Sequence, residues 1–119
     1  MKGALTSDHI AYLSIVVIEE RGEYEFIVDT GFSGSVYLPE DIIANWGLPF
    51  VSTVPIALAD QSTVTVDVYE AHLIWFGVTM RVPVLAAPAG GDSLLGMELL
   101  EGCRIELDRI NGEIRIELL

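Results

Sequence analysis

At 119 residues the chain is long enough for one domain with one hydrophobic core. Hydrophobic residues make up 51% of it and the mean hydropathy is +0.48, which excludes a disordered acidic tail. Six Lys and Arg stand against 18 Asp and Glu, and the net charge is −12. Nucleic acid is therefore not expected as a partner, because phosphate binding needs clustered basic side chains. The acidic surface also disfavours acidic substrates.

No targeting segment is expected. The apolar run Ile10 to Ile18 is too short to span a bilayer, and no basic region with a cleavage site precedes it. A strand explains this run better, so we expect cytoplasmic residence and no membrane partner. Cys103 is the single cysteine, which rules out an intrachain disulfide. A small buried apolar role suits it better than that of a thiol nucleophile.

Strand-type residues dominate the start of the chain. Ala11 to Ile18 is rich in β-branched and aromatic residues, and Glu20 to Glu23 is typical of a hairpin turn into a strand over Tyr24 to Val28. A short strand is predicted over Ser35 to Leu38. Pro39 to Gly47 then predicts a short helix, with proline at its start, acids in its first turn and glycine at its end.

Two hairpins are predicted in the middle of the chain. In the first, strands over Val54 to Ala59 and Thr63 to Tyr69 flank a polar tip, Asp60-Gln61-Ser62. Apolar residues alternate with polar ones along its second arm, as expected of a strand with one apolar face. In the second hairpin, Ala71 to Phe76 pairs with Val78 to Leu85.

The rest of the chain adds a loop and a last hairpin. Ala86 to Asp92 predicts the loop, and Asp108 to Gly112 predicts a turn between strands over Arg104 to Leu107 and Glu113 to Leu118. No linker, repeat or low-complexity block interrupts the sequence. We therefore expect one mainly β, barrel-like domain over residues 1–119, with one or two short helices.

The most informative stretch is Phe26 to Gly31, where three apolar strand residues lead into Asp29-Thr30-Gly31. A carboxylate at the end of a buried strand is costly unless other groups hold it. Thr30 offers a small donor and acceptor, and Gly31 lets backbone amides approach closely. This setting suits an acid that activates water, although Asp and Gly are also common in ordinary strand-ending turns.

In order and spacing, several pieces of the chain together resemble the retropepsin-like aspartic proteases, over most of its length. In that family an apolar strand leads into Asp-Thr-Gly, and a flap hairpin, an apolar pair plus glycine, a short helix and a closing strand follow. The matching pieces here are Phe26 to Gly31, the hairpin around Asp60-Gln61-Ser62, Leu94-Leu95-Gly96, and Met97 to Leu100. Phe32-Ser33-Gly34 and Leu38-Pro39 are most similar to the small prokaryotic members of the aspartic protease clan. The resemblance implies a retropepsin-like acid protease β-barrel.

The resemblance also implies an aspartic endopeptidase that acts on extended polypeptides, with apolar side chains favoured beside the cleaved bond. Such chemistry needs two carboxylates that share a proton, one as base toward water and the other as acid toward the carbonyl. The chain holds one Asp-Thr-Gly, and its other Asp residues lie in turn, helix-start or polar contexts. A symmetric homodimer is therefore expected, with the catalytic Asp29 of each subunit at the twofold axis.

Roles for the neighbouring residues follow from the same resemblance. Thr30 is expected to bond across to the partner's motif. The residues that support the catalytic loop are Thr30, Gly31, Leu94, Leu95 and Gly96. The substrate-binding residues are Phe32, Ser33, Ala59, Asp60, Gln61, Ser62 and Thr63. Taken alone, Leu94-Leu95-Gly96 reads as an ordinary strand that ends at a turn residue.

The sequence departs from the retroviral pattern in two places. The position after Asp-Thr-Gly is usually Ala or Ser, and here it is Phe32, whose ring either packs under the flap and narrows a substrate pocket or faces the core. The flap tip lacks the usual glycines, so Asp60-Gln61-Ser62 is either stiffer or recognises substrate through its side chains. The apolar chain ends, Ala4-Leu5 and Ile114 to Leu119, are expected in or near the dimer contact, because exposed edge strands invite pairing.

Two other interpretations stay open at this point. One is a catalytically silent dimer that uses the same cleft to bind peptides or to assemble with partners, since fold resemblance does not establish turnover. The other is a stand-alone β-barrel in which Asp29 is a structural turn residue. No cofactor is expected, and no metal site, because His9 and His72 lack matched spacing.

Overall fold

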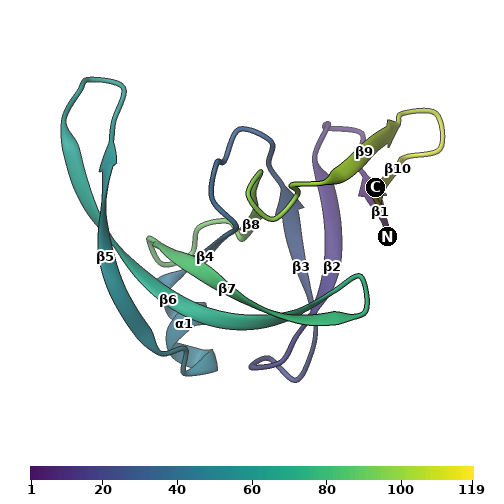
Figure 1. Ribbon diagram of the computed structural model, residues 1–119. Coiled ribbons are helices and arrows are strands. Elements are labelled where there is room, and N and C mark those ends of the chain that lie inside the picture. Colours follow the sequence, from purple (N-terminus) through teal and green to yellow (C-terminus); the bar gives the residue numbers. More distant parts are fainter.

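The computed structural model describes all 119 residues and contains ten strands and one helix (Figure 1). In chain order the elements are β1 (Lys2–Leu5), β2 (Ala11–Val17), β3 (Gly22–Val28), β4 (Val36–Pro39), α1 (Glu40–Trp46), β5 (Phe50–Ala57), β6 (Thr63–Trp75), β7 (Val78–Ala87), β8 (Leu94–Leu95), β9 (Cys103–Asp108) and β10 (Glu113–Leu118). The prediction of a mainly β chain is confirmed, and its helical content is one short helix.

All ten strands join one sheet in the order β5-β6-β7-β4-β8-β3-β2-β1-β10-β9. The sheet curls on itself, and a further pairing of β6 with β2, between Leu73 and Val17, brings distant strands together. In Figure 1 the β5–β6 hairpin rises at one side, β9 and β10 lie at the other, and the loop after β3 stands between them.

The core lies on the inner face of the curled sheet. Because successive strand residues face opposite sides, β2 buries Leu13, Ile15 and Val17, while Ser14 between them is exposed. The core cluster as a whole draws on β2, β3, β4, β6, β7, β8 and β10, on α1 and on the segments that follow α1 and β8. Residues from nearly the full length of the chain thus fix the position of the loop after β3.

The helix begins and ends where the sequence predicts. Pro39 precedes its first residue with φ −59° and ψ 146°, and Glu40 and Asp41 occupy its first turn, where carboxylates interact favourably with the helix dipole. Gly47 ends it in the left-handed conformation, φ 64°, which glycine adopts without strain. No helix of the structure has the length and apolar character needed to cross a membrane.

The predicted break between two strands at Glu70 is wrong, because β6 is one continuous strand. Its first part pairs with β5 and its second part with β7. Within it, the N–H of Glu70 donates to the carbonyl of Pro49 at 3.1 Å, and the carboxylate meets Arg81 of β7 at 2.8 Å. The charged residue is therefore accommodated inside the sheet, and nothing in this run forces the backbone to turn.

One turn and one short helix also differ from prediction. The β2–β3 turn covers residues 18–21 instead of Glu20 to Glu23, and Arg21 takes a positive φ of 64°. The helix expected over Met97 to Leu100 is a series of hydrogen-bonded turns. Leu100 donates back to the carbonyl of Gly96 at 3.3 Å, but Gly102 leaves the right-handed region with φ 75°, so there is no room for a helix to continue.

The chain ends pair within the chain. Antiparallel β1 lies between β2 and β10, and β10 lies between β1 and β9. The premise that Ala4-Leu5 and Ile114 to Leu119 form exposed edges is therefore wrong, and their place in or near a dimer contact stays a prediction. On this side of the molecule the free edge of the sheet belongs to β9.

Candidate active site

Asp29 follows directly after β3, at a point where three strands meet. Strand β8 lies between β3 and β4, parallel to the first and antiparallel to the second. The register sets Val28 beside Leu95, and the backbone N–H of Asp29 donates to the carbonyl of Leu95 at 2.9 Å. Leu95 is fully buried. The Asp29 loop, residues 29–34, is thus fixed at its start by a strand distant in sequence.

Within the loop, the half-buried Asp29 holds a tight local turn. Its Oδ1 accepts the backbone N–H of Gly31 at 2.8 Å, and its carbonyl accepts the N–H of Phe32 at 3.2 Å. A Cβ on residue 31 would lie 3.2 Å from Oδ1, so glycine suits this approach. The carboxylate keeps its second oxygen free of hydrogen bonds within the chain.

The other end of the loop is held by the segment that starts at Gly96. The N–H of Met97 donates to the carbonyl of Phe32 at 2.8 Å, and the N–H of Gly96 donates to the carbonyl of Ser35 at 2.9 Å. A Cβ on Gly96 would lie 2.2 Å from the carbonyl oxygen of Gly34. Only glycine fits here without moving the backbone. The structure therefore places Leu94, Leu95 and Gly96 beside the Asp29 loop, where the sequence had suggested them.

Phe32 stabilises the loop and also forms part of a pocket wall. Its half-buried ring contacts Tyr37 edge to face, with ring centroids 5.7 Å apart. The ring packs closely on two glycines: a Cβ on Gly34 would lie 2.6 Å from it, and a Cβ on Gly96 would lie 2.4 Å from it. Of the two positions considered for this ring, the structure favours the one that borders the pocket under the flap.

That pocket has a volume of about 570 Å³ and lies between the Asp29 loop and the arms of the flap, the β5–β6 hairpin. Its lining residues are Gly31, Phe32, Ser33, Gly34, Tyr37, Val54, Pro55, Ile56, Leu58, Val64, Val66, Leu85 and Glu98. Two cross-strand pairs, Val54 with Val66 and Ile56 with Val64, supply much of the apolar wall from the flap arms.

The flap arms, and not the tip, therefore line the pocket. Of the predicted substrate-binding residues, Phe32 and Ser33 do so, whereas none of residues 59–63 does. The alternation of Val64 and Val66 with polar neighbours already indicated an apolar face on this arm. What the sequence could not indicate is that this face turns toward the Asp29 loop, since that depends on the curl of the whole sheet.

The flap tip is exposed and closed by its own hydrogen bonds. The Leu58 N–H donates to the Ser62 carbonyl at 2.8 Å, and Asp60 Oδ1 accepts both the N–H and the hydroxyl of Ser62. The Ser62 hydroxyl and N–H hold the pKa of the Asp60 carboxyl below its usual value. Gln61 takes φ 69°, the left-handed conformation that glycine would otherwise supply.

The remaining candidate groups form no second catalytic constellation. His72 bonds to Glu19 at 2.7 Å through Nδ1, and His9 lies 2.9 Å from Arg109. Burial raises the pKa of the Cys103 thiol, which does not favour a nucleophile. No group of three or more His, Cys, Asp or Glu side chains is placed to hold a metal ion.

A slightly larger cavity, about 620 Å³, lies beside the β6–β7 turn and is lined by Trp75, Val78 and Met80 among others. It holds no residue of the Asp29 loop. We therefore assign the candidate active site to the pocket under the flap, because residues 31–34 of the loop that carries Asp29 form part of its wall.

Known proteins resemble the chain in sequence pattern and in fold. The family model for aspartyl proteases matches residues 15–99, and no curated protein sequence matches the chain. The crystal structure of a retropepsin-like aspartic protease from Rickettsia conorii is similar, with a TM-score of 0.68 and 20% identity over 96% of this chain and 86% of that one. EIAV protease complexed with the inhibitor HBY-793 is also similar, with a TM-score of 0.59 and 13% identity over 81% and 89% of the two chains.

The family model spans more than half of the chain and includes both Asp29-Thr30-Gly31 and Leu94-Leu95-Gly96. The two structural matches confirm the predicted retropepsin-like fold. The chain belongs to the aspartyl protease family and has the retropepsin-like fold.

Proposed function

We propose that the chain is an aspartic endopeptidase whose active site forms at the twofold axis of a homodimer, with Asp29 contributed by each subunit. The observation that carries the proposal is the Asp29 loop itself. The Asp29 backbone bonds to Leu95, its carboxylate accepts the Gly31 N–H, and residues 31–34 of the same loop line an apolar pocket under a flap. The chain contains one such motif, and the chemistry needs two acids.

In the proposed dimer the two carboxylates share one proton. Like charges this close cannot both be ionised, so one carboxyl stays protonated while the other is a carboxylate, and the pair titrates as a unit. The carboxylate takes a proton from water, and the protonated partner donates a hydrogen bond to the carbonyl of the scissile peptide. Thr30 is exposed, and its hydroxyl is free to bond across to the partner's motif.

The surroundings of Asp29 favour a particular substrate class. An extended peptide would lie between the flap and the Asp29 loop, with an apolar side chain in the pocket formed by Phe32, Val54 and Val66. The chain has no Lys or Arg between Arg21 and Arg81, a stretch that includes the Asp29 loop and the flap. Acidic peptides are therefore expected to be poor substrates.

The test is Asp29→Asn, assayed on an unfolded protein substrate from acidic to neutral pH. Loss of general base and general acid together should lower cleavage by several orders of magnitude. Fold and dimer should persist, because Asn keeps the shape of Asp and still accepts the Gly31 N–H. Equal cleavage rates for wild type and Asp29→Asn would mean that the hydrolysis does not depend on Asp29. A wild-type dimer inactive at every pH would favour a peptide-binding or assembly module.

A further inference from the structure

One end of the sheet is an unprotected edge. Strand β9 pairs with β10 over six consecutive residue pairs without a bulge, and its other side has no neighbour (Figure 1). At the opposite end of the sheet, β5 carries Pro55 and a register irregularity between Phe50 and Ser52. Prolines and bulges discourage strand pairing at an edge, and β9 has neither.

The pattern of hydrogen bonds shows which backbone groups of β9 point outward. The N–H of Leu119 donates to the carbonyl of Gly102 at 3.0 Å, just beyond the last pair of the β9–β10 ladder. Because bonded and non-bonded pairs alternate in an antiparallel ladder, the bonds to β10 come from Arg104, Glu106 and Asp108. The N–H and C=O groups of Ile105 and Leu107 therefore point away from β10, toward the free side.

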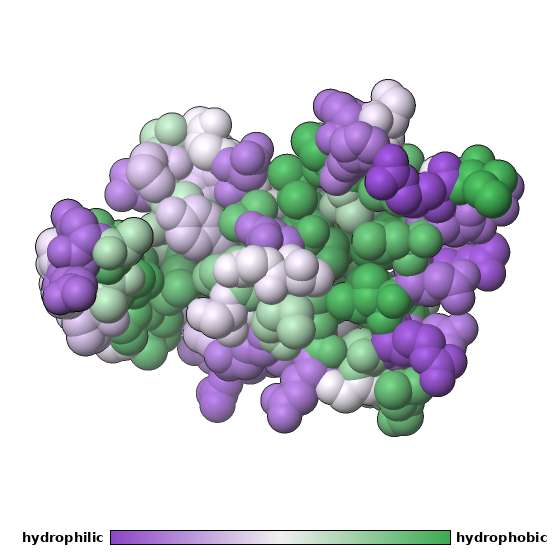
Figure 2. All heavy atoms as spheres, turned by 90° about the horizontal axis from the view of Figure 1, so that it is seen from above, coloured by the Kyte–Doolittle hydropathy of each residue, from purple (hydrophilic) through white to green (hydrophobic).

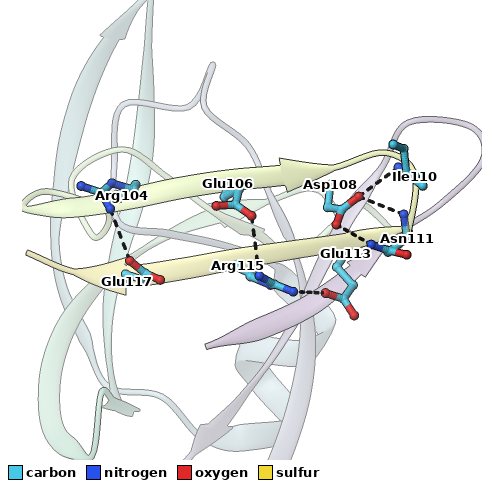
Figure 3. A network of polar contacts seen from close by, with 8 residues as sticks. All are labelled: Arg104, Glu106, Asp108, Ile110, Asn111, Glu113, Arg115 and Glu117. Carbon is cyan, nitrogen blue, oxygen red and sulfur yellow. Dashed lines mark hydrogen bonds and ion pairs between the residues drawn. The ribbon is translucent and has the colours of Figure 1, made fainter.

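The two faces of the β9–β10 hairpin differ in character. On the core side, Ile114 and Ile116 are fully buried, yet Leu107 and Leu118 are 56% and 61% exposed. The other face is charged, and Figure 3 shows Arg104 opposite Glu117 and Arg115 opposite Glu106 on it. The apolar face that begins in the core therefore continues, exposed, toward the free edge of the sheet.

We propose that β9 pairs antiparallel with β9 of a second copy of this chain, with Ile105 opposite Ile105 of the partner subunit on the twofold axis. The inference rests on the proposed homodimer and specifies how it assembles. The site is incomplete without the second copy, since each chain supplies one Asp-Thr-Gly. The sheet would then continue from one subunit into the other.

Charge selects this register among those that the outward-pointing groups allow. With Ile105 on the axis, Arg104 of each subunit faces Glu106 of the other. A register centred on residue 104 would set Arg104 opposite Arg104 of the partner subunit, and one centred on residue 106 would set Glu106 opposite Glu106 of the partner subunit. A register centred on Leu107 would set Glu106 opposite Asp108 of the partner subunit. Opposite charges directly across a strand pair stabilise it and like charges destabilise it. Among the registers centred on residues 104–107, only the one centred on Ile105 contains no pair of like charges, and the N–H of Cys103 is already bonded to Leu100.

The same register places the exposed leucines of both subunits on one face of the joined sheet. Leu107 comes to lie opposite Cys103 of the partner subunit, and Cys103 is the neighbour of Leu118 in the β9–β10 ladder. Leu107 and Leu118 of the partner subunit therefore lie on the same face of the joined sheet, on either side of Cys103 of the partner subunit. Figure 2, which looks down on the upper side of Figure 1, shows apolar side chains gathered from the middle of this face toward the hairpin side, with polar groups around them.

Copies of a chain with a net charge of −12 repel each other, and the β9–β10 hairpin is richer in basic residues than most of the chain. Three of the six basic residues, Arg104, Arg109 and Arg115, lie in it. Basic side chains at the contact offset part of the repulsion between two acidic subunits. No such group lies in the flap or in the Asp29 loop.

The test uses Arg104→Glu and Glu106→Arg, analysed separately and mixed, by sedimentation. Each single variant sets two pairs of like charges across the axis, so its dimer should dissociate about tenfold more readily than wild type, or more. In the mixed dimer every facing pair has opposite charges again. Mixing should therefore restore a heterodimer of near wild-type affinity, and should restore cleavage if the proposed function holds.

Glu117→Arg is the matched control. It removes the same ion pair with Arg104 inside the chain, but from an inner strand, and it should leave dimerisation unchanged. Leu107→Pro supplies a test independent of charge, because it removes only an outward N–H and proline is tolerated there; it should yield folded monomer. Single variants that dimerise like wild type, or a mixture that associates no better than its components, would overturn the inference. Sedimentation does not depend on cleavage, so this failure is distinct from failure of the proposed function.

Discussion

The Asp29 loop and the flap tip are built on the same local turn but differ in what surrounds it. In each, an Asp Oδ1 accepts the N–H of the residue two positions on, Gly31 at 2.8 Å and Ser62 at 2.9 Å. The Asp29 loop is also bonded to Leu95, Met97 and Glu98, whereas the flap tip bonds only to itself. We therefore expect the Asp29 loop to be more rigid than the flap tip, because strands distant in sequence hold it and the turn itself is the same in both.

The largest expected loss of stability comes from a variant that disrupts the backbone contacts supporting the Asp29 loop. Gly96→Ala places a Cβ 2.2 Å from the Gly34 carbonyl, so the backbone has to shift, and we expect a loss of about 3 kcal/mol in the free energy of unfolding. Gly22→Ala is the matched control, because a Cβ there meets nothing within 4 Å, and it should stay within about 0.5 kcal/mol of wild type. Urea unfolding at one protein concentration measures both. Similar losses in the two variants would contradict the role of Gly96.

A second pair of variants compares packing on the two sides of the pocket. Phe32→Ala removes a half-buried ring from two glycines and Tyr37, and should cost about 2 kcal/mol of unfolding free energy. Leu58→Ala removes a side chain that is 45% exposed near the flap tip and should cost about 0.5 kcal/mol. Both residues line the pocket, so both variants should cleave more slowly. Equal stability losses would mean that the two regions are equally well packed.

Amide exchange measures the same contrast without a mutation. The N–H groups of residues 60–63 should exchange at least about tenfold faster than those of Asp29 and Met97, which donate to Leu95 and Phe32. A peptide-like inhibitor should slow exchange at the flap tip and leave Asp29 unchanged. Equal protection of the tip with and without the inhibitor would contradict the substrate-binding role that the sequence predicts for it.

The smallest effect concerns pH at the flap tip. The pKa of Asp60 lies below its usual value because the Ser62 hydroxyl and N–H bond to the carboxylate. The stabilisation is therefore complete above the ordinary Asp pKa and is lost as pH falls through the lowered value. The NMR shift of the Ser62 amide should stay constant down to about pH 4 and move only below it. Ser62→Ala should raise the pKa of Asp60. An unchanged midpoint in that variant would assign the shift to another cause.

How much the sequence could predict depends on whether a feature is local. Pro39 and Gly47 bound the helix, Asp108 to Gly112 turns as expected, and Asp29-Thr30-Gly31 ends a strand, because each depends on neighbouring residues. Glu70 was misread as a break, since its partner Arg81 comes from another strand. The Asp29–Leu95 bond, the flap arms in the pocket and the free edge at β9 depend on how the whole sheet curls, and no local pattern encodes that.

The central claim is that one active site is made by two chains, and mixed dimers test it most directly. Wild-type and Asp29→Asn chains are refolded together at constant total concentration, and cleavage is measured against the wild-type fraction. If both Asp29 side chains are needed, only dimers of two wild-type chains are active, and an equal mixture should retain about one quarter of the full rate. A linear decline, with about one half of the rate at equal mixture, would show that each chain carries a complete site and would contradict the account.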